Sequence, residues 1–279
     1  MSVAWRRFVA HRLALAGLVL IVGLAIVAAL AGQVAPHDPI RQDLPRALAT
    51  PSRDFPLGAD EFGRCILSRI LYGARLSLLV GVIATAIGAV TGILLGLLAG
   101  YFARLDTLVM RTMEVLLAFP SILLAIAIVA ALGPSLVNVM IAVGLRSIPA
   151  YARLTRSMVL SLKELEFVQG VHALGAGHAR VLFRHILPNS VSPLVVFSSM
   201  QVATSILLAA ILSFLGLGVQ PPTPEWGKMV SDGRAYLLEA PHVSLFPGVA
   251  IFLTVLGFNC LGDGLRDALD PRMRAGVGE

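Results

Sequence analysis

The residues whose types and spacing could do chemistry are concentrated in one basic, polar stretch, from Ser161 to Asn189, between long apolar segments. The sequence contains no metal-binding or nucleophile motif of the kinds His-Glu-x-x-His, Cys-x-x-Cys or Gly-x-Ser-x-Gly. Its one Gly-Lys pair, Gly227–Lys228, is followed by Met229 and lacks the upstream glycine of a phosphate-binding loop. We therefore predict no catalytic residue, metal site or cofactor in this chain, and expect the polar stretch to bind a partner.

The local pattern of this stretch predicts a helix, a sharp turn and a second helix. Ser161, followed three residues later by Glu164, fits a capping box, so we expect a helix to begin at Ser161. Gly175 can adopt the left-handed backbone conformation that ends a helix, and Gly177 loosens the chain again. The second helical stretch is expected to end at Pro188, which cannot donate a backbone hydrogen bond.

The composition is that of a polytopic membrane protein. Hydrophobic residues make up 57% of the chain, charged residues only 14%, and the mean hydropathy is +0.85. Cys65 lies in a polar segment and Cys260 in an apolar one, which excludes a disulfide framework. The net charge of +6 is no sign of nucleic-acid binding, because membrane proteins collect Lys and Arg in cytoplasmic loops.

Apolar runs long enough for a bilayer predict an all-α protein with six transmembrane helices. The first run could be a secretory signal, since Ala29–Ala31 resembles a cleavage site, but its length favours an uncleaved anchor. Glycines recur at nearly helical spacing in the second run and predict close helix packing, at positions 81, 88, 92, 96 and 100. The expected spans are Leu13–Ala31, Leu76–Tyr101, Val115–Leu132, Leu136–Ala150, Val191–Leu217 and Val243–Leu261.

These spans divide the chain into four parts. We expect a cytoplasmic N-terminus with the first helix at 1–35, an extracytoplasmic loop at 36–75, a core at 76–263 and a cytoplasmic tail at 264–279. The core would hold five helices and a cytoplasmic loop at 158–190. More than half of the 22 lysines and arginines fall in segments that share one side with the termini, which favours cytoplasmic termini.

The polar stretch resembles the cytoplasmic "EAA" loop of ABC importer permeases, which matches Glu166, Gly175, His185, Pro188 and Asn189 in residue type and spacing. In that family the loop lies in a groove of a separate ATPase subunit, so the resemblance implies that ATP and Mg are bound by partner chains. The chain departs from the family pattern at Gly170 and Val171, where two alanines are usual. The implied coupling residues are Glu166, Gly170, Val171, Ala173, Leu174, Gly175, His185, Pro188 and Asn189.

The resemblance covers nearly the whole chain and is closest to the second permease subunit of the peptide and nickel branch. Cys65 stands where that branch commonly has an aspartate after Gly-Arg. The matching motifs are Ala35–Pro39, Leu57–Asp60 with Gly63–Arg64, Tyr72–Leu78, Ala118–Pro120, Ala152–Arg153, Leu212–Gly218, Glu225–Gly227 and Leu261–Asp267.

This resemblance implies the type I ABC importer permease fold in a bacterial cytoplasmic (inner) membrane. The expected partners are a homologous permease forming a heterodimer, two ATP-binding subunits and an extracytoplasmic substrate-binding protein. The outer segments 36–75 and 219–242 would meet the binding protein or simply cover the helix bundle. The expected substrate is a di- or oligopeptide, and glutathione or nickel are the alternatives.

Polar residues inside the apolar runs are candidates for the translocation path. An arginine in lipid is costly, so we expect Arg146 to face a water-filled cavity or a partner helix, or to reach a membrane interface by snorkelling. Asn138, Gln201 and Asn259 could line the same path or hydrogen-bond between helices.

A stand-alone secondary transporter is the alternative class of function. It is less favoured because the spans contain almost no acidic residues, which such proteins place near the membrane midplane. An inert anchor is disfavoured by the long polar loops.

Overall fold

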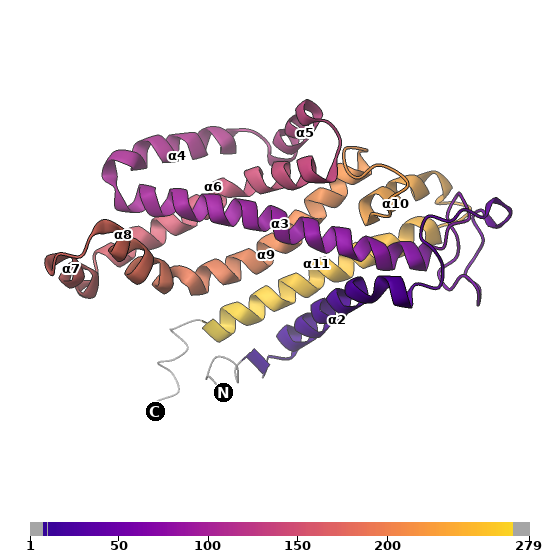
Figure 1. Cartoon of the computed structure of the whole chain (residues 1–279), viewed down its shortest axis with the longest axis horizontal. Coiled ribbons are helices and arrows are strands. Elements are labelled where there is room, and N and C mark those ends of the chain that lie inside the picture. Colours follow the sequence, from indigo (N-terminus) through magenta and orange to yellow (C-terminus); the bar gives the residue numbers. More distant parts are fainter. Residues whose placement is uncertain (1–7, 10, 270–279) are drawn as a thin grey trace.

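Long helices lie side by side along the longest dimension of the molecule (Figure 1). A computed structural model of the chain describes residues 8, 9 and 11–269. Within these residues no strand forms, and the one isolated β-bridge joins Ala59 to Cys65. The long helices are α2 (Arg12–Val34), α3 (Ile66–Tyr101), α6 (Leu136–Lys163), α9 (Leu187–Phe214) and α11 (His242–Leu269).

Shorter elements connect the long helices and form the two ends of the molecule. At one end lie α7 and α8, and the start of α2 and the end of α11 point toward the same end (Figure 1). The irregular segment after α2 and the helix α10 lie at the opposite end. These elements are η1 (Leu44–Arg46), α4 (Ala103–Ala118), α5 (Ser121–Leu132), α7 (Glu166–Ala173), α8 (His178–Arg180), the π-helical η2 (Val181–Ile186), α10 (Trp226–Gly233) and η3 (Arg234–Tyr236).

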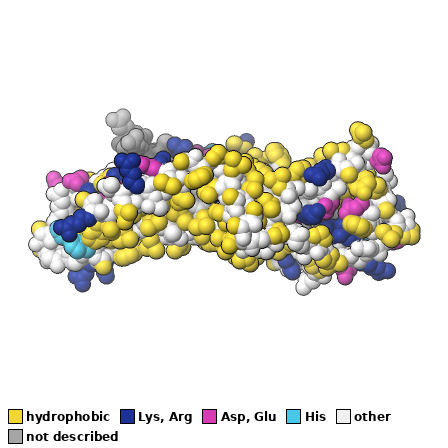
Figure 2. Space-filling view, turned by 90° about the horizontal axis from the view of Figure 1, so that it is seen from above, with side chains coloured by type: hydrophobic (Ala, Val, Ile, Leu, Met, Phe, Trp, Pro, Cys, Tyr) yellow, Lys and Arg dark blue, Asp and Glu magenta, His cyan; other side chains and the backbone are white. Residues whose placement is uncertain are grey.

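The surface has the distribution of side chains that a membrane requires. Hydrophobic side chains cover the middle of the face seen in Figure 2, whereas Lys, Arg, Asp and Glu gather toward both ends. Four of the described helical segments are long and apolar enough to cross a bilayer: 12–34, 66–101, 178–214 and 242–269. The tail at 264–279 is described only to Leu269, and Arg6, Arg7, Arg272 and Arg274 lie outside the described residues.

The expected third span is not a single helix. α4 ends at Ala118, α5 begins at Ser121, and the two helices meet at an angle of 90°. Phe119 is extended, as is usual before a proline, and Pro120 cannot donate the hydrogen bond that would continue α4. With 12 residues α5 is about 18 Å long, too short to cross alone, so only the bent pair could make a fifth span.

Two other predicted boundaries differ from the observed ones. α3 begins at Ile66, so the last ten residues of the predicted outer loop are helical. α6 does not end near Ala150 but continues to Lys163, because its far half still packs against α3. Arg146, Arg153 and Arg156 keep α6 out of the set of apolar helices that could span by composition.

The glycine stripe of α3 is the main packing device of the fold, as its spacing predicts. A Cβ atom at Gly92 would lie 2.6 Å from the carbonyl oxygen of Ile148, and one at Gly96 would lie 2.5 Å from that of Ala152. Gly100 is equally close to Val159. Residue numbers rise together on both helices, so α3 and α6 run parallel with their backbones in near contact.

We predict that Gly92→Ala destabilises the protein by about 1–3 kcal/mol, because the added methyl group meets rigid backbone. Gly23→Ala in α2 is the matched control, since nothing lies within 4 Å of a Cβ atom there. Helix propensity alone gives this control a gain of up to about 1 kcal/mol. Thermal unfolding of the purified protein in detergent would measure both changes, and equal midpoints for the two variants would contradict the packing assignment.

Candidate functional site

The polar stretch 161–189 begins inside α6 and not at the start of a helix. The hydroxyl of Ser161 donates to the carbonyl of Ser157 at 3.1 Å, so it does not cap a new helix. Val159 and Leu162 pack against α3 and hold this last turn of α6 in place. The capping-box prediction was therefore wrong, and the new helix α7 begins five residues later, at Glu166.

One side of α7 packs against the helix bundle, and the opposite side is exposed. Val168 is only 3% exposed and joins Leu97, Val181 and Ile186 in an apolar cluster that links α7 to α3 and to the start of α9. Val171 packs on the edge of the same cluster. The opposite side is exposed and carries Glu166, Phe167, Gln169, Gly170 and Ala173.

The turn after α7 is a Schellman motif, and Gly175 ends the helix as predicted. Gly175 has a φ of +82°, a conformation that costs other residues energy. Its N–H donates to the carbonyl of His172 at 3.0 Å, and the N–H of Ala176 donates to that of Val171 at 3.3 Å. The turn exposes 89% of the Leu174 surface at its tip.

Pro188 does not end the second helix, which is continuous from His178 to Phe214. The preceding turns, Val181–Ile186, are π-helical, and the N–H of Leu187 bonds the carbonyl of Leu182, five residues back. The π turn contains one more residue than an α-helical turn and so changes which backbone carbonyl faces the ring of Pro188. The helix can therefore continue past this proline. The prediction that the helix ends there was wrong because a single sequence gives no signal for a π turn.

Of the two remaining predicted coupling residues, His185 lies within this π-helical stretch and Asn189 follows it. The side-chain amide of Asn189 donates to the backbone carbonyl of His185 at 2.6 Å. The His185 ring is half-buried. His185, Pro188 and Asn189 thus belong to the base of the segment, whereas Glu166, Gly170, Ala173, Leu174 and Gly175 form its outer surface.

Sequence reasoning did not find two features of the segment. Leu165, Phe167 and Phe183 are each close to half exposed, so the segment has exposed apolar side chains besides Leu174. The hydroxyl of Tyr101 lies 3.0 Å from Nδ1 of His178 and so connects the end of α3 to α8. A signal for the first feature is present in the sequence, because apolar residues on the polar side of a short helix indicate a contact surface.

The four path candidates lie on three helices, and the contacts explain one of them. Asn138 donates to the carbonyls of Leu132 and Gly133 at 2.9 Å, so it closes the turn between α5 and α6, in agreement with the packing alternative. Gln201 is buried in α9, and Asn259 is exposed on α11. Arg146 is half-buried, and its Nε and Nη2 atoms are buried without a hydrogen-bond partner among the described residues.

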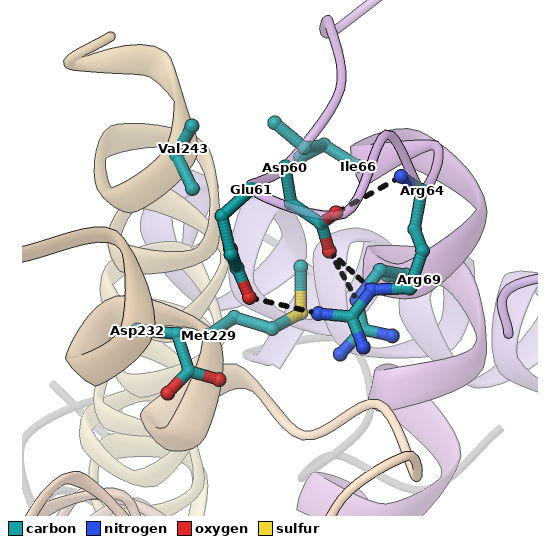
Figure 3. Close-up of a pocket in the computed structure, with 8 residues that line it drawn as sticks. All are labelled: Asp60, Glu61, Arg64, Ile66, Arg69, Met229, Asp232 and Val243. Carbon is teal, nitrogen blue, oxygen red and sulfur yellow. Dashed lines mark hydrogen bonds and ion pairs between the residues drawn. The ribbon is translucent and has the colours of Figure 1, made fainter. Parts of the chain in front are cut away.

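A buried ion cluster stabilises the opposite end of the molecule (Figure 3). Nε of Arg64 lies 2.6 Å from Asp60, and its Nη2 lies 3.0 Å from Glu61. Arg69 of α3 lies 3.4 Å from Asp60 and donates to the carbonyl of Pro39 at 3.0 Å. The enclosed space is only about 10 Å³, so the cluster fastens the outer segment to α3 and α10 and does not bind a substrate.

Burial changes the ionisation of two carboxyl groups at this outer end. Desolvation, reinforced by the negative charge of Asp60, raises the pKa of Glu61. Burial also raises the pKa of Glu225, although this carboxylate accepts hydrogen bonds from the N–H groups of Gly227 and Lys228 at the start of α10. Cys65 is the buried residue that precedes α3, and its side chain makes no capping hydrogen bond to that helix. An aspartate at this position could make one.

Comparison with known families and proteins gives matches over nearly the whole chain. The family model described as "Binding-protein-dependent transport system inner membrane component" matches residues 92–275. The model described as "N-terminal TM domain of oligopeptide transport permease C" matches residues 1–51.

Curated relatives are about half identical to this chain. "Glutathione transport system permease protein GsiD" of Pectobacterium atrosepticum is 50% identical over 97% of this chain and 91% of its own length. "Dipeptide transport system permease protein DppC" of Alkalihalophilus pseudofirmus is 48% identical over 98% of this chain and 90% of its own length. GsiD of Escherichia coli O157:H7 is 52% identical over 97% of this chain and 90% of its own length.

A solved structure supports the fold. The crystal structure of an amino acid ABC transporter with histidines superposes with a TM-score of 0.54 over 71% of this chain and 92% of that chain. The two sequences are 14% identical, so this similarity concerns the fold alone.

We predict that Gly175→Ala loosens the turn after α7 without unfolding the helix bundle. The left-handed conformation costs an alanine about 1–2 kcal/mol, which corresponds to roughly a tenfold faster amide hydrogen exchange over residues 166–177. Gly170→Ala is the control, because a Cβ atom there meets nothing within 4 Å. Equal exchange in both variants would contradict the role of Gly175.

Proposed function

We propose that this chain, which belongs to the family of inner membrane components of binding-protein-dependent transport systems, is a permease subunit of an ATP-driven ABC importer. The proposed substrates are di- or oligopeptides. The similarity at about 50% identity to dipeptide and glutathione permeases, over nearly the full length, carries this proposal. The surface of α7 and its turn supports it from the structure, because it exposes the apolar side chains of Phe167 and Leu174 at one end of the helix bundle.

The proposed topology has six membrane crossings, with the bent pair α4–α5 as the third and α6 as the fourth. The parallel packing of α3 and α6 supports this topology. Two helices that cross a membrane in the same direction must have an odd number of crossings between them, and the bent pair α4–α5 would be that one crossing. Both termini then lie on the side of α7. The excess of Lys and Arg in the segments of that side favours the cytoplasm.

We propose that the exposed side of α7 and the tip Leu174 dock into a separate ATP-binding subunit, which holds ATP and Mg. The anchor through Val168 and Val171 gives this contact a mechanical role, because the same cluster includes residues of α3 and of the π turn before α9. A force applied to α7 is thus passed directly to two membrane helices. Glu166 places a negative charge in the first turn of α7, where the helix dipole stabilises it. The exposed carboxylate could pair with a basic group of the ATP-binding subunit.

The complete importer would contain further chains. We propose a homologous permease as heterodimer partner, two ATP-binding subunits, and an extracytoplasmic binding protein that meets the outer end, in a bacterial cytoplasmic membrane. The buried ion cluster around Asp60 supports such a contact, because it makes the outer segment a fixed surface.

Glutathione is the second candidate substrate. Relatives named as glutathione permeases are 50–52% identical to this chain, no less than the dipeptide permease at 48%. Both substrates are short peptides with a free carboxylate, so the similarity does not separate them.

We predict that Leu174→Asp lowers both substrate uptake and binding-protein-stimulated ATP hydrolysis at least tenfold in the full complex. The new charge would have to be desolvated in the docked state, at a cost of several kcal/mol. Glu166→Gln should weaken coupling less, and Glu164→Gln, an exposed glutamate outside α7, should have no effect. Intact uptake and stimulated hydrolysis in a Glu166→Gln, Leu174→Asp double variant would overturn the docking assignment.

We also predict that transport needs the ATPase subunits and the binding protein. Proteoliposomes with the full complex should take up a labelled dipeptide or glutathione when ATP is supplied to the α7 side, and competition between the two should identify the substrate. Liposomes that contain the permeases alone should show no uptake. Gradient-driven uptake by this chain alone would establish a secondary transporter instead.

A further inference from the structure

One face of α6 is left uncovered and carries two arginines. Residues Arg146, Ala150, Arg153, Ser157 and Ser161 follow one another at intervals of three or four and therefore lie on the same side of the helix. All except the half-buried Arg146 are exposed. We call these five residues the basic stripe of α6.

The neighbouring helices pack elsewhere on α6 and leave this stripe open. α3 packs on the side of Gly144, Ser147 and Tyr151, and α9 reaches the same side, where the hydroxyl of Tyr151 donates to that of Ser198 at 2.9 Å. α4 packs through Met113 against Ile148 and Ala152. The stripe is therefore an open surface along a helix that runs through the apolar middle of the molecule.

Among the described residues, this side of α6 is covered beyond Arg146. There Val139 and Val143, which are on the same side of α6 as the stripe, are buried in an apolar cluster with Ala125 and Val129 of α5 and residues of α9. Arg146 thus lies where the cover by α5 ends, with its guanidinium partly shielded from solvent.

Neither arginine of the stripe has an acidic partner among the described residues. The nearest acids of α4 are already used, since Asp106 pairs with Arg156 at 2.5 Å and Glu114 with Arg111 at 3.1 Å. Two guanidinium nitrogens of Arg146 have no hydrogen bond at all. An uncompensated arginine at membrane depth requires an anionic or aqueous neighbour that this chain does not supply.

We propose that Arg146 and Arg153 are specificity-determining residues that bind the substrate carboxylate during translocation, which rests on the proposed import function. Seven residues separate them along the helix, about 10 Å, so a carboxylate passes from one guanidinium to the next along the stripe. The planar guanidinium binds a carboxylate through two parallel hydrogen bonds. Ala150 and Ser157 leave room between and below them. The class of substrate is thus a small peptide with a free carboxylate.

The test uses the full complex with its binding protein in proteoliposomes, and labelled glutathione or alanyl-glutamate, whichever the wild type imports. We expect Arg146→Gln to lower the maximum uptake rate about tenfold and Arg153→Gln three- to tenfold, as for loss of a charge-assisted hydrogen bond. Arg146→Lys should slow uptake less than Arg146→Gln does, because lysine keeps the charge but not the two parallel hydrogen bonds. Arg111→Gln, an exposed arginine of α4 away from the stripe, is the matched control.

Binding-protein-stimulated ATP hydrolysis in each variant reports assembly independently of transport. Preserved hydrolysis with slow uptake in the Gln variants supports the proposal. Unchanged uptake in both Gln variants, or a Lys variant as slow as the Gln variant, would overturn it. Loss of permease pairing in both Gln variants would also overturn it, since the stripe would then be a subunit interface. A wild-type complex that takes up neither glutathione nor any di- or oligopeptide would instead refute the import function on which the proposal rests.

Discussion

The near contact between the backbones of α3 and α6 is the constraint on which the rest of the structure depends. It exists because α3 has glycine at every fourth position facing α6, so that carbonyl groups of Ile148 and Ala152 occupy the space of missing side chains. Such small-residue contacts suit a membrane, where burial of apolar surface between helices gains little over lipid. The contact runs from Gly144 to Val159 and therefore carries this helix well past its predicted end near Ala150.

The position of α6 in turn determines both candidate sites. Its last turn delivers the chain into α7, and the apolar cluster around Val168 ties α7 back to α3. Because one side of α6 is pressed against α3 and another against α4, the charged side is left open. Arg156, next to that side, is held by Asp106, whereas Arg146 and Arg153 remain available. The polar stretch 161–189 and the basic stripe are thus parts of one continuous helix and its extension.

Much of this arrangement was predictable from the sequence, for identifiable reasons. Apolar runs and the glycine period report directly on burial and close packing, and Gly175 was recognised because few other residues tolerate its backbone conformation. The errors have equally specific causes. Ser161 looked like a helix start, but packing of Val159 and Leu162 on α3 carries α6 through it. Pro188 looked like a helix end, but a π turn accommodates it.

Other features had no local signal at all. The pairing of Arg64 and Arg69 with Asp60 depends on the path of the outer segment, and the 90° bend at Pro120 could equally have been a mild kink. The basic stripe became visible only when the structure showed which side of α6 its neighbours cover. Propensity and periodicity describe one element at a time, whereas these features arise between elements.

The most direct test of the account is the accessibility of a single thiol at the tip of the turn after α7, introduced as Leu174→Cys with Cys65 and Cys260 replaced by serine. In intact cells a membrane-impermeant maleimide should not label it. In inside-out vesicles it should be labelled when the ATP-binding subunits are absent and protected when they are present. Labelling from outside intact cells, or equal labelling with and without those subunits, would contradict the claim that α7 is a cytoplasmic docking site.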